Sequence, residues 1–295
     1  MKKAFIQLHI AVFLAGFTGI LGKLISLNEG WLVWYRLLIT TVTLWFIAIL
    51  RDQNYRIAQG PLMRIFGIGC IATLHWLCFY GSIKYGNASI AMVCYSAVGF
   101  FTSLLEPAIL RTRVDWTECL LGSLTIIGIY FIFQFDPGYK TGILLGLMAA
   151  LLGSIFPILN KGMLMTVSFE MLILYELSGG FIFLSMQMPV YLKIFPGGPF
   201  LPSLRDWGWL FVLSWVCTVF AFNLSMRALQ RISAFTVNLS YNLEPVYGVL
   251  LAFLFLKENR NLHSGFYAGL GCILFSIIAQ MLRLWRKRER PLLKA

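Results

Sequence analysis

The sequence predicts an all-α membrane protein with ten transmembrane helices, and three observations lead to this fold class. The chain has 295 residues, of which 59% are hydrophobic and only 12% are charged, whereas soluble domains carry about 25% charged residues. Its mean hydropathy is +0.79. Apolar runs separated by short polar breaks fill nearly the whole length, and a helix needs about 20 such residues to cross a bilayer. We therefore expect no separate soluble domain.

The ten expected helices are apolar runs that end at charged residues, glycine or proline. They cover residues 4–25, 31–50, 62–84, 88–110, 116–135, 141–163, 169–192, 206–228, 233–256 and 262–284. The first run is longer than the apolar core of a signal peptide, so we expect it to remain as a membrane helix. The longest connection, about 193–205, is too short to fold by itself.

The distribution of Lys and Arg predicts that both ends of the chain are cytoplasmic. Sixteen of these residues fall in one alternate set of loops and in the tail, seven fall in the other set, and Arg36 lies within a helix. Loops rich in Lys and Arg remain on the cytoplasmic side. The net charge of +12 is therefore interpreted as contact with lipid headgroups, and nucleic acid is not expected as a partner.

The six cysteines and three histidines predict no metal site, disulfide framework or cofactor. All six cysteines fall inside apolar runs, and none forms a C-x-x-C pair or lies near a histidine at metal-ligand spacing. They are expected to pack as small apolar residues.

The second half of the sequence matches the first half at several positions in the same order. At a constant offset, Ala88, Tyr95, Leu105, Leu110 and Arg111 align with Ala234, Tyr241, Leu251, Leu256 and Lys257. Residues 1–138 and 139–284 are thus expected to be five-helix repeats, followed by a basic cytoplasmic tail at 285–295. Because five is odd, tandem copies would cross the membrane in opposite senses, around a central cavity with a site near the midplane. The alternative is chance similarity between Leu-rich helices.

Glu244 is the most informative polar residue in the predicted membrane region. A charged side chain there costs at least roughly 2.5–3.5 kcal/mol, so it needs a partner, water or a function. Asn238, Tyr241, Asn242 and Pro245 lie on the same arc of the helix, about 160° wide. Pro245 also frees a backbone carbonyl one turn earlier. Glu244 is expected either to contact a substrate or carry a proton, or to lock its helix to a neighbour by a hydrogen bond.

Arg36 and its repeat mate Glu176 are expected to be structural or gating charges. Arg36 lies about five residues below the outer end of its predicted helix. It could attract an anionic group, pair with another side chain, or extend to the headgroups, and a structural role is favoured.

Aromatic and amide side chains suggest a binding pocket for a small amphipathic solute with a ring or a cationic group. His75, Trp76 and Tyr80 share a face of one helix, and His75 is expected to be neutral and bonded to a carbonyl. Ordinary packing is the alternative for each aromatic residue. The candidate substrate-binding residues are Trp76, Tyr80, Tyr95, Ser96, Asn238, Tyr241, Asn242 and Glu244.

Two segments resemble the EamA-like family of the drug/metabolite transporter superfamily. They are Trp34-Tyr35-Arg36-Leu37-Leu38 and the run from Ala234 through Asn242-Leu243-Glu244-Pro245-Val246 to Leu256-Lys257-Glu258. The first half departs from this pattern, because Gly99 stands where the repeat places Pro245 and Thr112 stands where it places Glu258. The resemblance implies a bacterial inner-membrane carrier, often an exporter of amino acids, metabolites or toxic compounds.

The expected function is therefore secondary transport of a small metabolite by alternating access. Catalytic patterns such as H-E-x-x-H or G-x-S-x-G are not found in the sequence, so an enzyme is not expected. The alternatives are a structural or sensor subunit, or a lipid-type carrier. The glycine pairs Gly142/Gly146 and Gly265/Gly269 predict close helix contacts, in a monomer or a homodimer.

Overall fold

A computed structural model describes residues 2–51, 56–135, 137–195, 197–229, 231, 237 and 240–289. In these residues the chain forms helices and connections, without a strand. The α-helices are α1 (Lys2–Leu24), α2 (Glu29–Leu50), α3 (Gln59–Tyr85), α4 (Ala88–Tyr95), α5 (Val98–Leu110), α6 (Trp116–Phe135), α7 (Lys140–Met163), α8 (Phe169–Ile194), α9 (Leu204–Phe211), α10 (Ala221–Leu229), α12 (Glu244–Leu251) and α13 (Ser264–Glu289). The π-helical segments are η2 (Val212–Phe220) and η3 (Ala252–Leu256), and the 3₁₀ turns are η1 (Pro137–Tyr139) and η4 (Glu258–Asn261).

The prediction of an all-helical membrane protein is confirmed. Within the described residues, eight helices are long and apolar enough to cross a bilayer. Two further apolar helices are shorter, Trp116–Ile132 and Glu244–Leu256. The total of ten crossings and the opposite orientation of the repeats remain predictions.

Side-chain caps explain where several helices begin. The Asn28 carboxamide oxygen accepts a hydrogen bond from the Trp31 amide at 2.9 Å, and that of Asn87 accepts from the Ile90 amide at 2.8 Å. Ser203 and Asp206 form a capping box at the start of α9. Each cap satisfies an amide that has no partner within its helix, which matters most where water is absent.

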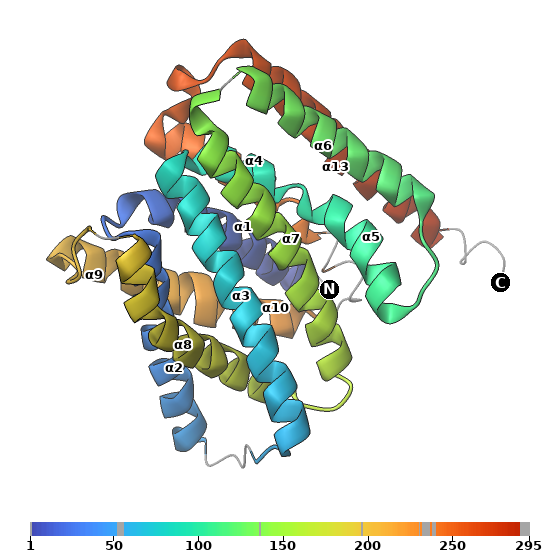
Figure 1. Ribbon diagram of the computed structural model, residues 1–295. Coiled ribbons are helices and arrows are strands. Elements are labelled where there is room, and N and C mark those ends of the chain that lie inside the picture. The colour runs from blue at the N-terminus through green and yellow to red at the C-terminus, as the bar shows by residue number, and fades with distance from the viewer. Residues whose placement is uncertain are drawn as a thin grey trace.

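The first helix of each half packs against helices of the other half. α1 packs against α10 and α12 of the second half, and α7 packs against α3, α4 and α5 of the first half. In Figure 1, α3 and α7 lie beside each other through the bundle, and α6 and α13 form an antiparallel pair at its edge. The central part of the interface is therefore built by α1 and α7.

Glycines allow these first helices to approach their neighbours closely. A Cβ atom on Gly16 of α1 would lie 2.9 Å from the Gly248 nitrogen and 3.0 Å from the Glu244 carbonyl oxygen. A Cβ atom on Gly153 of α7 would lie 3.0 Å from the Tyr95 ring. These distances are below normal van der Waals contact, so backbone approach depends on the absence of side chains.

The glycine pair of α7 also makes close helix contacts, as its spacing predicts. A Cβ atom on Gly142 would lie 2.9 Å from Gly86, and one on Gly146 would lie 2.9 Å from the Ser82 hydroxyl. In the α6–α13 pair, Gly269 approaches the carbonyl of Gly128.

The membrane segment expected over residues 88–110 is present with these bounds, but it is divided into α4 and α5, which corrects the prediction of one continuous helix. Ser96 and Ala97 form a turn between α4 and α5. The Ala97 amide donates to the Cys94 carbonyl, three residues earlier, and the Ser96 hydroxyl donates to the Val93 carbonyl at 2.5 Å. These local bonds tighten the chain and interrupt the regular α-helical pattern.

The second half has a turn at the aligned position, within the residues that the structure describes. Asn242 and Leu243 form a turn before α12, and the Leu243 amide donates to the Ser240 carbonyl. Pro245 follows and has no amide proton to continue a helix. The two following segments end alike, because Arg111 and Lys257 both have φ of 55°. The described parts of these segments thus share both a break and a terminal conformation at aligned positions.

Gly16→Ala is expected to lower the free energy of unfolding by about 1–3 kcal/mol, because its Cβ atom would press on the backbone of α12. Gly67→Ala in α3 is the matched control, since a Cβ atom at that position would have no neighbouring atom within 4 Å, and it should be neutral or slightly stabilising. Thermal unfolding in detergent measures both. Equal melting temperatures for the two variants would contradict the close-contact interpretation.

Candidate functional site

The Arg36 side chain lies inside the bundle, with an exposure of 5%. Its Nη1 donates to the Tyr80 hydroxyl at 2.9 Å, and its Nη2 donates to Thr218 Oγ1 at 3.1 Å. Its Cζ lies 4.2 Å from the centre of the Trp76 ring. The buried Nε has no hydrogen-bond partner. Arg36 therefore does not extend to the headgroups; neutral polar groups and an aromatic face surround it.

Charge compensation at Arg36 is incomplete. In the part of the chain that the structure describes, no salt bridge involves this residue. Glu244 of α12 interacts with it electrostatically, without a direct hydrogen bond between the two among the described residues. Its bonded partners Tyr80 and Thr218 supply dipoles, which stabilise a cation less than an opposite charge does.

His75 connects this region to the end of α4. Its Nδ1 donates to the Ala149 carbonyl at 2.8 Å, as expected for a neutral histidine. Its ring centroid lies 5.5 Å from that of Tyr95. Phe79 lies 5.8 Å from the same tyrosine ring, nearly edge-on. Tyr95 therefore packs on the face of α3 that also carries Trp76 and Tyr80.

Tyr241 and Glu244 occupy the corresponding break in the second half. The Tyr241 and Ser225 hydroxyl oxygens are 2.5 Å apart. Glu244 interacts electrostatically with both Tyr241 and Tyr95. We group these two tyrosines and this carboxyl group with Arg36, Trp76 and Tyr80 as the polar cluster, in which Trp76 and Tyr80 contact Arg36 directly.

The structure brings some of the residues expected at the site into contact. Trp76 and Tyr80 contact Arg36, Tyr95 packs against His75, and Tyr241 is bonded to Ser225. Within the described residues, neither Tyr241 nor Glu244 makes a hydrogen bond or ion pair with Arg36. Ser96 and Asn242 lie in the two turns, and the Ser96 hydroxyl is bonded to its own helix. Asn238 lies outside the described residues.

Glu176 has a different environment. It is 5% exposed, and its Oε2 accepts a hydrogen bond from Asn160 Nδ2 at 2.9 Å. This bond joins α8 to α7 within the second half.

Several contributors to the cluster were missed at the sequence level. Thr218 bonds Arg36, and the Ser214 hydroxyl lies 3.4 Å from the Arg36 carbonyl oxygen. Both come from η2, a π-helical segment of a kind that is frequent at functional sites. The sequence feature that could have identified them is a pair of hydroxyl residues, Ser214 and Thr218, four positions apart in an apolar run.

Buried carboxylates connect the two halves at one end of the bundle, which we call the Ser26 end. Asp206 accepts from the Ser26 amide at 2.7 Å and from its hydroxyl at 2.6 Å. Glu258 accepts from the Ala88 amide at 3.1 Å, and from the Ser89 amide and hydroxyl at 2.8 and 2.6 Å. Asp206 and Glu258 are both buried. They fix the first half to the second by bonds at α1 and α4.

Ion pairs join the halves at the opposite end. Lys161 pairs with Glu106 at 2.8 Å, and their side chains are 64% and 36% exposed. Arg283 of α13 pairs with Asp115 before α6 at 2.5 Å. These pairs are more accessible than the carboxylates at the Ser26 end.

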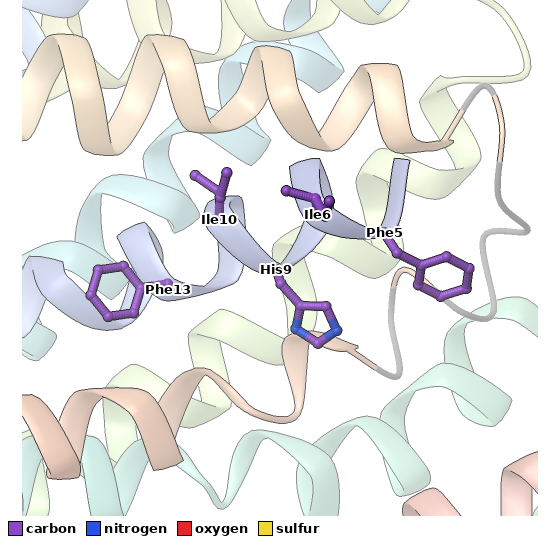
Figure 2. Close-up of a pocket in the computed structure, with 5 residues that line it drawn as sticks. All are labelled: Phe5, Ile6, His9, Ile10 and Phe13. Atoms are coloured by element: carbon purple, nitrogen blue, oxygen red, sulfur yellow. The ribbon is translucent and has the colours of Figure 1, made fainter. Parts of the chain in front are cut away.

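A groove of about 360 Å³ lies on the exposed face of α1. Figure 2 shows the residues that line it, Phe5, Ile6, His9, Ile10 and Phe13, along one stretch of this helix. The Tyr247 hydroxyl lies 3.4 Å from His9 Nδ1. The groove is apolar apart from His9 and is lined by different residues from those of the polar cluster.

These features define a multi-pass helical membrane protein with a buried polar cluster at two broken helices. The sequence model of the EamA-like transporter family matches residues 2–134 and 140–281. The chain belongs to this family, within the drug/metabolite transporter superfamily.

The chain is also similar to individual proteins. The uncharacterized transporter YcxC of Bacillus subtilis (strain 168) is 24% identical over 221 residues, which cover 71% of this chain and 69% of YcxC. A solved crystal structure has a TM-score of 0.62 over 97% of this chain and 99% of its own, at 15% identity. That structural similarity supports the fold alone.

Tyr80→Phe is expected to lower the free energy of unfolding by about 1–3 kcal/mol, because Arg36 loses a buried hydrogen-bond partner. Tyr85→Phe changes an exposed tyrosine on the same helix and should have little effect. Thermal unfolding of the two purified variants makes the comparison. A Tyr80→Phe protein as stable as the Tyr85→Phe protein would show that this bond contributes little.

Proposed function

We propose that the protein is a secondary transporter that exports a small amphipathic metabolite across the bacterial inner membrane by alternating access. In this proposal ten helices cross the membrane, residues 1–138 and 139–284 form two inverted repeats, and both termini are cytoplasmic. Family membership supports transport in general. The more specific features rest on the arguments that follow.

The observation that carries the proposal is the pair of helix breaks beside a buried polar cluster. Discontinuous helices at corresponding positions of two halves are typical of secondary transporters, whose substrate sites lie at such breaks. Here the turns at 96–97 and 242–243 lie next to Tyr95 and Glu244. We assign substrate binding to the polar cluster, with Ser96, Asn238 and Asn242 as further proposed contacts.

Glu244 is proposed to act through its charge. Glu244 is the first residue of α12, directly after the turn at 242–243. Arg36 is the charged side chain that interacts with it electrostatically. A carboxyl group in this position could bind a cationic part of the substrate or exchange a proton during the transport cycle. Either role requires a group that ionises, which glutamine does not provide.

Glu244→Gln is expected to reduce transport to background while the protein still inserts and folds. Substrates for this assay come from thermal-shift screening of the purified protein against amino acids, nucleosides, vitamins and cationic dyes, followed by uptake into proteoliposomes. Glu170→Gln at the exposed start of α8 is the matched control and should transport normally. Full activity of Glu244→Gln would rule out the proposed role of its charge.

Alternating access requires closure at one end at a time, and we propose that the Ser26 end is the outer, closed end. The count of Lys and Arg places the loops at this end outside. Buried Asp206 and Glu258 hold the halves together there through bonds to Ser26, Ala88 and Ser89. Opening to the outside would break these bonds.

Glu258→Gln is expected to increase exposure of the cluster to the outer side, because an amide is a weaker acceptor than a carboxylate for the α4 amides. Cys217 is a native reporter near Arg36 and is 6% exposed. In a variant that retains only this cysteine, labelling by an impermeant maleimide from outside should rise several-fold.

Glu106→Gln is the control for this measurement, since it weakens the exposed pair with Lys161 at the opposite end. It should leave outer labelling of Cys217 unchanged. Equal labelling in both variants and in the parent would contradict closure by Glu258.

A lipid-type carrier is the second candidate, and the groove on α1 favours it. Its Phe5, Ile6, Ile10 and Phe13 side chains would suit an acyl chain approaching from the bilayer. This candidate predicts movement of a fluorescent phosphatidylglycerol between the leaflets of proteoliposomes, blocked by Ile10→Trp but not by Glu244→Gln.

A further inference from the structure

Arg36 differs from the other buried charged residues that the structure describes. Glu258 accepts three hydrogen bonds, and Asp206 is bonded to both Ser26 and Ser203. Glu176 is bonded to an amide. Arg36 has two neutral acceptors, an aromatic face and one buried donor without a partner.

The guanidinium geometry indicates what could satisfy that donor. Arginine presents five N–H groups in a planar fork, and a carboxylate accepts two parallel bonds from one edge of it. The Nη1 and Nη2 atoms each bond one protein hydroxyl, whereas Nε bonds none. The edge that contains Nε is therefore the edge with an N–H group that lacks a partner within the described residues.

The surrounding charges favour an anionic ligand over a neutral one. Within the described residues Arg36 lacks a salt bridge, and Glu244 interacts with it only at a distance. A buried cation without a bonded counter-ion lowers stability, so its presence is more easily explained by binding than by folding.

We propose that Arg36 binds a carboxylate group of the transported solute. Trp76 holds the face of the guanidinium, and Tyr80 and Thr218 fix its plane. The substrate class is then a small carboxylate, with its remaining polar or cationic part toward Glu244. This inference rests on the proposed function, because it describes one end of the same substrate.

The test compares solutes that differ only in a carboxylate. Matched pairs are phenylalanine and phenethylamine, leucine and isopentylamine, nicotinate and nicotinamide, and indole acetate and indole acetamide. Binding is measured by thermal stabilisation and transport by proteoliposome uptake. The parent protein should bind the carboxylate member of at least one pair tenfold or more tightly. Arg36→Gln should abolish that preference, and Arg36→Lys should retain part of it, because lysine keeps the charge but lacks the fork.

The stability of the empty protein provides a second readout. Arg36→Gln removes the buried charge together with its bonds to Tyr80 and Thr218, whereas Tyr80→Phe leaves the charge in place, so the melting temperature of Arg36→Gln should not fall below that of Tyr80→Phe. A purely structural arginine would instead lower the melting temperature below that of Tyr80→Phe and leave the ligand preference intact. Arg64→Gln, at an exposed position of α3, is the control and should change neither quantity.

The outcomes separate this inference from the proposed function. Transport of both members of a pair with equal affinity, or an unchanged preference in Arg36→Gln, overturns the carboxylate site while transport itself stands. Absence of transport for every solute of the pairs and of the wider screen overturns both.

Discussion

Close helix contact at Gly16, against the backbone of α12, and at Gly153, against the His75 and Tyr95 side chains, constrains how the two halves pack. These glycines seat α1 and α7 against the broken helices of the opposite half, at Glu244 and at Tyr95. Any larger residue would separate the layers and leave the turns without support. Because each half supplies a helix to the other, neither break is packed by its own repeat alone. The arrangement explains how two interrupted helices persist in an apolar environment, where unsatisfied backbone groups are costly.

Within the described residues, Arg36 is a buried cation that forms no ion pair. The guanidinium is fixed by Tyr80, Thr218 and Trp76, which position it but do not neutralise it. Buried Glu258 and Asp206, by contrast, each accept hydrogen bonds from several donors. A membrane helix could have used leucine at position 36 at lower cost. Arg36 therefore differs from these carboxylates, because its charge is not matched by a bonded counter-ion within the described residues.

Much of the fold and part of the cluster were predictable from local sequence. The lengths of the apolar runs predicted the helices. Glu244 and Tyr95 were identified by their polarity and by the alignment of the two repeats. The turn at Ser96 was missed because Gly99 replaces the proline that marks the second break, and the turn depends on hydrogen bonds that no composition rule reveals. Thr218 was missed because its role depends on the contact between α2 and η2, which are distant in sequence.

The two ends of the bundle also differ in how their contacts respond to the surrounding solution. At the Ser26 end, buried carboxylates accept bonds from amides and hydroxyls, and dissolved ions have little access to them. At the other end, Lys161 and Glu106 are exposed, and mobile ions screen such a pair over about 8 Å at physiological ionic strength. Added salt therefore weakens one end selectively. In the proposed alternating-access cycle, the ionic strength of the medium would therefore bias which side of the protein opens, without altering a single residue.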